Sequence, residues 1–195
     1  MLSSKLGHSF DPVLAKISQF IFKKHEANAN IITVFGTLLG FVSSACIVFD
    51  HFLCAGLALL VSGFCDMLDG AVARSSRKVT AFGGFLDSVL DRYTDLLLIG
   101  GVLIYYLMRQ SAVMVVVTFI SAIGTAIIPY ARARAESLSI ECKSGLLERP
   151  ERIVLLLIGL FIPYTLSSVI VILAVLTHIT VIQRMVTVRR ALKHF

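Results

Sequence analysis

Three long apolar runs without a single Asp, Glu, Lys or Arg constrain this chain most strongly. They lie at Ile31–Phe49, Ala112–Tyr130 and Leu166–Ile182. A helix of about 20 such residues spans the hydrocarbon core of a bilayer, which is about 30 Å thick. Only 15% of the residues are charged, against roughly 25% in an ordinary soluble domain. The sequence therefore predicts an all-α integral membrane protein.

Three shorter apolar runs complete the set, at Phe52–Cys65, Leu96–Met108 and Ile153–Tyr164. Each is too short to cross a membrane alone. The first two must extend into the polar stretch between them, and the third must extend into Arg149–Arg152. We therefore expect six transmembrane helices, with both termini on the same side.

The distribution of Lys and Arg predicts the orientation. Arg109 is the one residue among the 18 Lys and Arg that falls on the opposite side from both termini. All the others fall in the N-terminal segment, at the second-to-third and fourth-to-fifth junctions, or in the C-terminal tail. Because positively charged loops stay inside, both termini are expected to be cytoplasmic and the protein to lie in the cell (inner) membrane.

The N-terminal segment has the pattern of an amphipathic helix. In "SFDPVLAKISQFIFKKHE", apolar residues recur at helical spacing and lysines lie opposite them. This pattern suits a helix lying in the membrane interface, and an ordinary packing helix is the alternative. We therefore divide the chain into an interfacial helix, residues 1–29, and a six-helix transmembrane domain, residues 30–195.

The polar stretch between the second and third spans holds five aspartates. Asp66 and Asp69 are three residues apart and share one helix face, and Asp87 and Asp91 share a face of the next helix. Each carboxylate at membrane depth costs roughly 2.5–3.5 kcal/mol, and neighbouring carboxylates repel one another. Asp95 continues the second row one turn deeper, where we expect a structural ion-pairing role.

Divalent cations would relieve this repulsion. Carboxylates without Cys or His nearby favour Mg²⁺, or Mn²⁺, and four of them could bridge two ions. Two such ions beside Arg74 point to a phosphate-bearing substrate. Helix-end carboxylates paired with arginines are the structural alternative. A cation transporter would instead spread acidic residues across the membrane, whereas these cluster at one level. No nucleic-acid partner is expected.

The spacing of these residues resembles the signature of the CDP-alcohol phosphatidyltransferases. The signature is present here as Asp69-Gly70, Ala73-Arg74, Gly83, Asp87 and Asp91, with Asp66 as the additional aspartate. The resemblance implies six transmembrane helices, a homodimer and divalent metal. It also implies an enzyme of phospholipid biosynthesis that faces the cytoplasm. This enzyme would transfer a phosphatidyl group from CDP-diacylglycerol, or an ether-lipid analogue, to an alcohol and release CMP.

The resemblance also implies roles for single residues. Asp66, Asp69 and Asp87 would be metal ligands, and Asp91 would be a ligand and the general base. Gly70 and Arg74 would contact the nucleotide diphosphate. Asn30 and Thr33 match positions that help hold the cytidine, although Ala29 stands where the family often has proline. Capping and packing are equally open roles for these two residues.

A second basic cluster concerns the acceptor. Arg132, Arg152 and Arg184, from three helices, would suit a dianionic acceptor because arginine matches phosphate with a planar fork of donors. A positive-inside flank is the alternative. The segments "ARARAE", "ERPER" and "QR" resemble the phosphatidylinositol phosphate synthase branch and its archaeal archaetidylinositol counterparts, which implies inositol 1-phosphate. Phosphatidylglycerophosphate synthesis from glycerol 3-phosphate, or a CDP-inositol-using enzyme, remains open.

Overall fold

The structure, a computed structural model, describes residues 29–75, 80–142 and 145–193, with the backbone alone at residues 73–75. Within these residues the regular structure is entirely helical. The helices are α2 (Ala29–Val48), α3 (Phe52–Ser75), α4 (Ala81–Met108), α5 (Ala112–Glu136), α6 (Arg149–Phe161), the short 3₁₀ helix η1 (Pro163–Thr165) and α7 (Leu166–Leu192). The interfacial helix expected before Asn30 lies outside the described residues.

The helices follow the apolar runs, except that α6 ends earlier than its run. Both α3 and α4 extend through the aspartate stretch, as expected from the shortness of their apolar parts. The fifth apolar run reaches Tyr164, but α6 ends at Phe161. Pro163 explains the early end, because proline lacks an N–H and disfavours helical backbone at the residue before it.

Four of these helices are long and apolar enough to cross a membrane by length and composition: α2, α3 up to Val72, α5, and η1 together with α7. α4 misses this standard because charged residues occupy its first half, and α6 is only 13 residues long. The protein is therefore an all-helical membrane protein.

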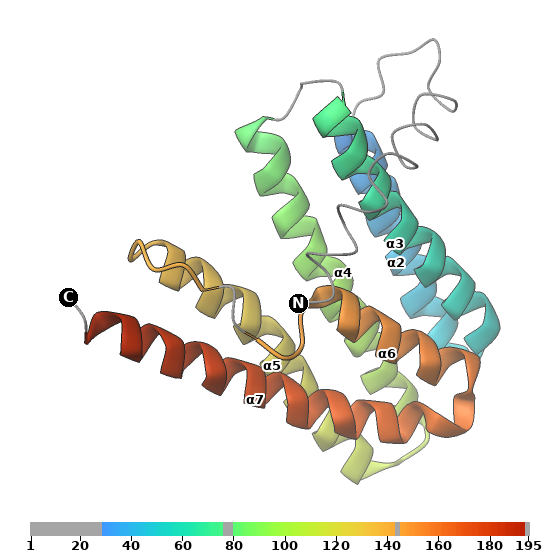
Figure 1. Cartoon of the computed structure of the whole chain (residues 1–195). Helices are drawn as coiled ribbons and strands as arrows, with labels where there is room; N and C mark the ends of the chain where they lie inside the picture. The colour runs from blue at the N-terminus through green and yellow to red at the C-terminus, as the bar shows by residue number, and fades with distance from the viewer. Residues whose placement is uncertain (1–28, 76–79, 143–144, 194–195) are drawn as a thin grey trace.

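The helices form two groups that meet through the α4–α5 contact and through α6 (Figure 1). α2 packs against α3 and α4, and α5 packs against α7. α4 also contacts α5, while α6 contacts α3 on one side and α7 on the other. The aspartate-bearing parts of α3 and α4 therefore lie in one group, and the arginine-bearing ends of α5 and α7 lie in the other.

Small and hydroxyl-bearing residues bring α2 close to its two neighbours. Ser62 of α3 donates a 2.7 Å hydrogen bond to the Gly36 carbonyl, and Ser44 donates a 2.6 Å hydrogen bond to the Leu97 carbonyl of α4. Such contacts are typical of helix packing in membranes, where small residues let backbones approach. As a result, α2 fixes the spacing of the two aspartate-bearing helices.

Two adjacent glycines in α4 provide a test of this packing. A Cβ at Gly101 would lie 2.6 Å from Ser44 Oγ and 2.8 Å from the Ser44 carbonyl oxygen, whereas a Cβ at Gly100 meets no described atom within 4 Å. We expect Gly101→Ala to lower the free energy of unfolding by about 1–3 kcal/mol. Gly100→Ala is expected to be neutral, or stabilising by up to about 1 kcal/mol. Thermal unfolding in detergent measures both, and equal midpoints would contradict the close approach.

The opposite end of the bundle carries an isolated pair of charges. Arg109, after α4, forms an ion pair with Asp50 in the turn after α2, and its guanidinium lies 4.6 Å from the Tyr105 ring centre. This pair accounts for the one basic residue that the sequence places on the far side. The acidic and basic residues of interest gather at the other end.

Candidate active site

The aspartates of α3 and α4 come near one another although the two helices pack mainly on α2 rather than on each other. Asp69 is buried, whereas Asp66, Asp87 and Asp91 are half-buried. Asp87 lies close enough to Asp66 and Asp69 for the carboxylates to repel. Asp66 of α3 and Asp91 of α4 contact the same guanidinium nitrogen, Nη1 of Arg149. The structure therefore brings the two rows together at one point.

Arg149, the first residue of α6, supplies the cation at this point. Its Nη1 forms a hydrogen-bonded ion pair with Asp66 and lies 2.8 Å from Asp91 Oδ1. In the part of the chain that the structure describes, no three His, Cys, Asp or Glu side chains are arranged to hold a metal ion as they stand. The donors nevertheless suit Mg²⁺ or Mn²⁺, because oxygens from both helices already meet at a shared positive charge.

Asp95 forms the ion pair that its position suggests. Its Oδ2 accepts a 2.6 Å hydrogen bond from Arg152, and its Oδ1 lies 3.5 Å from Arg149 Nε. Both Asp95 and Arg152 are buried. Because a buried charge is costly unless paired, Asp95 fixes where the Arg152 guanidinium lies.

The start of α6 is positioned by hydrogen bonds from α7. The backbone N–H of Leu147 donates to Thr180 Oγ1 at 3.1 Å, and that of Leu146 donates to Gln183 Oε1 at 3.0 Å. α6 begins directly afterwards, with a proline in its first turn, as the sequence predicts for Pro150. These contacts bring Arg149 and Arg152 to the aspartates.

The residues predicted for the CDP-linked lipid lie beside the aspartates. The Thr33 hydroxyl donates a 2.6 Å hydrogen bond to Asp69 Oδ2 and lies 3.0 Å from the Ala29 carbonyl. Asn30 Oδ1 is 3.2 Å from where a Cβ at Gly83 would be. Gly70 is half-buried in α3. The Arg74 side chain is outside the described residues.

The hydrogen bond from Thr33 makes this residue a positioning residue for Asp69. Because Asp69 is a predicted metal ligand, we expect Thr33→Val to weaken Mn²⁺ binding by about 10–100-fold, the usual contribution of a partner that orients a ligand. Thr37→Val is the matched control, because Thr37 donates only to the Thr33 carbonyl among the bonds the structure gives it. Electron paramagnetic resonance of free Mn²⁺ measures both affinities. Equal affinities in the two variants would contradict the assigned role.

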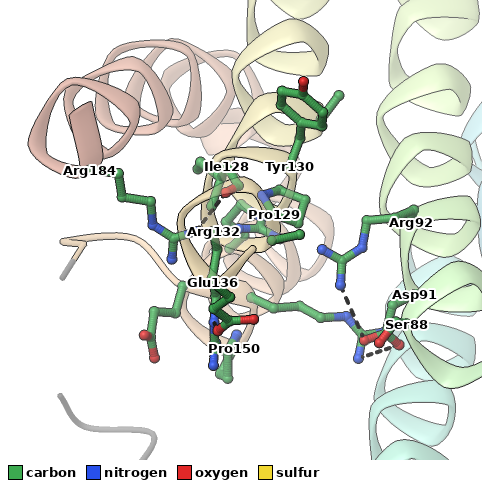
Figure 2. A pocket seen from close by; sticks show the side chains of 15 residues that line it. Ser88, Asp91, Arg92, Ile128, Pro129, Tyr130, Arg132, Glu136, Pro150 and Arg184 are labelled. Atoms are coloured by element: carbon green, nitrogen blue, oxygen red, sulfur yellow. Dashed lines mark hydrogen bonds and ion pairs between the residues drawn. The ribbon is translucent and has the colours of Figure 1, made fainter. Parts of the chain in front are cut away.

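A cavity of about 680 Å³ adjoins the aspartates. Its lining includes Asp91 of α4 together with all three arginines predicted for the acceptor, Arg132, Arg152 and Arg184. Figure 2 shows Asp91 and Ser88 on one side of the cavity, with Arg132 and Arg184 projecting from the other. The residues predicted for catalysis and for acceptor binding therefore share one space.

The charges on the cavity wall favour an anion. Five arginines line it against three carboxylates: Arg92, Arg132, Arg149, Arg152 and Arg184 against Asp91, Glu136 and Glu148. Arg132 forms an exposed 2.8 Å ion pair with Glu136. Arg184 is buried and donates a 2.6 Å hydrogen bond to the Ile128 carbonyl, and it shares the cavity wall with Arg132 and Arg152. A phosphate bound among these arginines would lower the repulsion between like charges.

From the sequence, Arg149 is expected only at the start of the fifth span, and no role is predicted for it. Its contacts with two aspartates depend on how α6 meets α3 and α4, which spacing does not determine. One signal was available. Arg149 precedes Arg152 by three residues, so the two share a helix face, and a role for one of them in the site implies proximity for the other.

Comparisons with known proteins agree with this geometry. The family model for CDP-alcohol phosphatidyltransferases matches residues 27–188. An archaetidylinositol phosphate synthase of Methanothermobacter thermautotrophicus is 36% identical over 197 residues, covering 98% of each chain. A phosphatidylinositol phosphate synthase of Mycobacteroides abscessus is 34% identical, covering 81% of this chain and 76% of the relative.

Solved structures give the same result. Mycobacterium tuberculosis phosphatidylinositol phosphate synthase (PgsA1) with CDP-DAG bound superposes with a TM-score of 0.84 at 27% identity, covering 91% of this chain and 94% of that one. The complex of PgsA1 with manganese and citrate gives 0.83 at 28% identity, covering 90% and 88%. The chain therefore belongs to the CDP-alcohol phosphatidyltransferase family.

Proposed function

We propose that this enzyme transfers the phosphatidyl group of CDP-diacylglycerol, or of an ether-lipid analogue, to the hydroxyl of inositol 1-phosphate and releases CMP. One observation carries the choice of acceptor: Asp91 lines the same cavity as Arg132, Arg152 and Arg184. The relatives named as archaetidylinositol and phosphatidylinositol phosphate synthases support the same acceptor. A phosphorylated alcohol would present its dianion to the arginines and its hydroxyl to Asp91.

Asp66, Asp69, Asp87 and Asp91 are the proposed ligands of two divalent ions, Mg²⁺ or Mn²⁺. The manganese complex of PgsA1 supports this assignment. When bound, such ions would hold the pyrophosphate oxygens of the CDP-linked lipid and stabilise charge on the departing CMP. The buried hydrogen bond from Thr33 keeps Asp69 oriented for this task.

Asp91 is the proposed general base. It accepts the proton of the acceptor hydroxyl, whose oxygen attacks the β-phosphorus of the CDP-linked lipid. The new phosphorus–oxygen bond forms as the bond from that phosphorus to the bridging oxygen breaks, and CMP leaves with the electron pair. Asp91 suits this role because its carboxylate belongs both to the aspartate cluster and to the wall of the acceptor cavity.

The CDP-linked lipid is proposed to bind on the α2–α3 side of the aspartates. Gly70 leaves room for the pyrophosphate to approach the α3 backbone, and Arg74 supplies a cation. Asn30 and Thr33 complete this side, where Asn30 faces Gly83. CDP-DAG bound to PgsA1 supports a CDP-lipid substrate here.

The proposed membrane arrangement has six spans. α4 measures about 42 Å at 1.5 Å per residue, which exceeds the hydrocarbon thickness, so its charged first half can reach the interface. α6 measures about 20 Å by the same rise, less than the hydrocarbon core, so it is proposed to form the fifth span together with η1. The aspartates and both termini would lie on the cytoplasmic side of the inner membrane. Residues 1–29 would lie in the membrane interface. We also propose a homodimer, which the mass of the detergent-solubilised protein tests.

An acceptor comparison tests the function. Purified protein receives CDP-diacylglycerol, Mg²⁺ and one of four alcohols: inositol 1-phosphate, glycerol 3-phosphate, serine or free inositol. We expect CMP release with inositol 1-phosphate and little with free inositol, because the arginines would lack a phosphate to bind. CMP release only with glycerol 3-phosphate would overturn the acceptor assignment and identify a phosphatidylglycerophosphate synthase.

A further inference from the structure

The contacts of Arg149 are unusual for a structural arginine. Its guanidinium reaches aspartates at three positions, Asp66, Asp91 and Asp95, which come from two helices. The side chain is 20% exposed, so it is not sealed in a core. Its Nε is buried and has no hydrogen-bond partner among the described residues. Arg149 is therefore held mainly by the charge of the aspartates.

From this geometry we propose that Arg149 is a displaceable internal cation. It neutralises Asp66 and Asp91 in the metal-free enzyme and withdraws when a divalent ion binds them. This inference rests on the proposed function in taking these two aspartates as metal ligands. A guanidinium and a divalent ion at the same pair of carboxylates would repel one another at close range.

The acceptor cavity can receive the withdrawn Arg149 side chain. Arg149 already lines the acceptor cavity together with Arg152 and Arg184. Hydrogen bonds from Leu146 and Leu147 to α7 hold the segment that leads into α6, so Arg149 can withdraw by a change of rotamer. Arg152 keeps its own partner, Asp95. Metal loading would thus add a free guanidinium to the cavity and strengthen its attraction for the acceptor phosphate.

Mn²⁺ binding to the Arg149→Gln variant tests whether Arg149 and the metal compete for Asp66 and Asp91. The measurement needs no catalytic turnover. Glutamine keeps hydrogen-bonding groups but removes the competing charge. We expect Mn²⁺ to bind about tenfold more tightly than to the wild-type enzyme, the change expected when one charge-assisted contact no longer has to be broken. Arg132→Gln is the matched control, because it removes the same charge from the same cavity but pairs with Glu136. Its Mn²⁺ affinity should change by less than about twofold.

Unchanged or weaker Mn²⁺ binding by Arg149→Gln would overturn the proposal, since Arg149 would then be holding the carboxylates in place for the metal. Circular dichroism in detergent checks folding. If Arg149→Gln does not fold, Arg149→Lys serves instead. Its compact ammonium cannot match the planar fork of arginine, so its Mn²⁺ affinity should exceed that of the wild type. A wild-type enzyme that binds no Mn²⁺ at all would instead count against the proposed function.

Calorimetry with inorganic phosphate tests where the side chain goes. In the wild-type enzyme, Mg²⁺ should strengthen phosphate binding both directly and through the freed Arg149. Mg²⁺ lowers the dissociation constant of phosphate by some factor in each protein. In Arg149→Gln this factor should be about tenfold smaller, because one arginine–phosphate contact is lost. Equal strengthening in both proteins would overturn the withdrawal of Arg149 into the cavity.

Discussion

Replacing Asp91 with asparagine is expected to lower kcat for CMP release by about 10³-fold or more. A positioned general base contributes about 10²–10⁴-fold, and this change also removes one proposed metal ligand. The fold should survive, because Arg149 keeps Asp66 and Asp95 as partners. Chromatographic measurement of CMP at saturating substrate tests the prediction.

The control for Asp91→Asn makes the same chemical change at the other end of the bundle. Asp50→Asn removes a carboxylate that pairs with Arg109, far from the cavity. Because that pair is exposed, its loss should change little, and kcat is expected to stay within about twofold of the wild-type value. If Asp91→Asn retained more than about a tenth of the activity, Asp91 would not be the base.

Arg152→Ala is expected to raise KM for inositol 1-phosphate by about 30-fold or more. A hydrogen bond to a charged group contributes about 1.5–3 kcal/mol, and arginine can make two with one phosphate. The dissociation constant of the CDP-linked lipid should change less than about threefold, since Arg152 faces the cavity rather than the α2–α3 side.

The same substitution should also destabilise the protein. Removing Arg152 leaves Asp95 buried with only the 3.5 Å contact to Arg149, and breaking a buried ion pair typically costs about 3–5 kcal/mol. The double variant Asp95→Asn/Arg152→Ala separates the two effects, because it removes the unpaired charge but not the acceptor defect. Its stability should recover while KM stays high. Equal loss of acceptor and CDP-lipid binding in Arg152→Ala would contradict an acceptor role.

Helical periodicity explains why much of this site could be predicted from the sequence. Residues three or four apart share a face whatever the tertiary structure. The spacing alone therefore predicts that Asp66 shares a helix face with Asp69, and Asp87 with Asp91. The apolar runs predict the helices for a different reason, the length needed to cross the hydrocarbon core. The motif from Asp69-Gly70 to Asp91 indicates the family, which the comparisons confirm.

Contacts between distant segments could not be predicted in this way. The hydrogen bond from Thr33 to Asp69 joins residues 36 apart, and Thr33 was expected to hold cytidine or to pack. Arg149 reaches Asp66 across 83 residues. Both contacts depend on how α2 and α6 approach α3. The apolar run extends to Tyr164, but α6 ends at Phe161. The run was defined by hydrophobicity alone, which does not take account of the helix-ending effect of Pro163.

Anomalous diffraction from crystals grown with Mn²⁺ tests the central claim most directly. The claim is that carboxylates of α3 and α4 jointly bind divalent ions beside an arginine-lined cavity. We predict Mn²⁺ peaks bonded to oxygens from both helices, with Asp66 and Asp91 among the ligands and Arg149 withdrawn. Mn²⁺ held by one helix alone, or bound away from Asp66, Asp69, Asp87 and Asp91, would contradict the account.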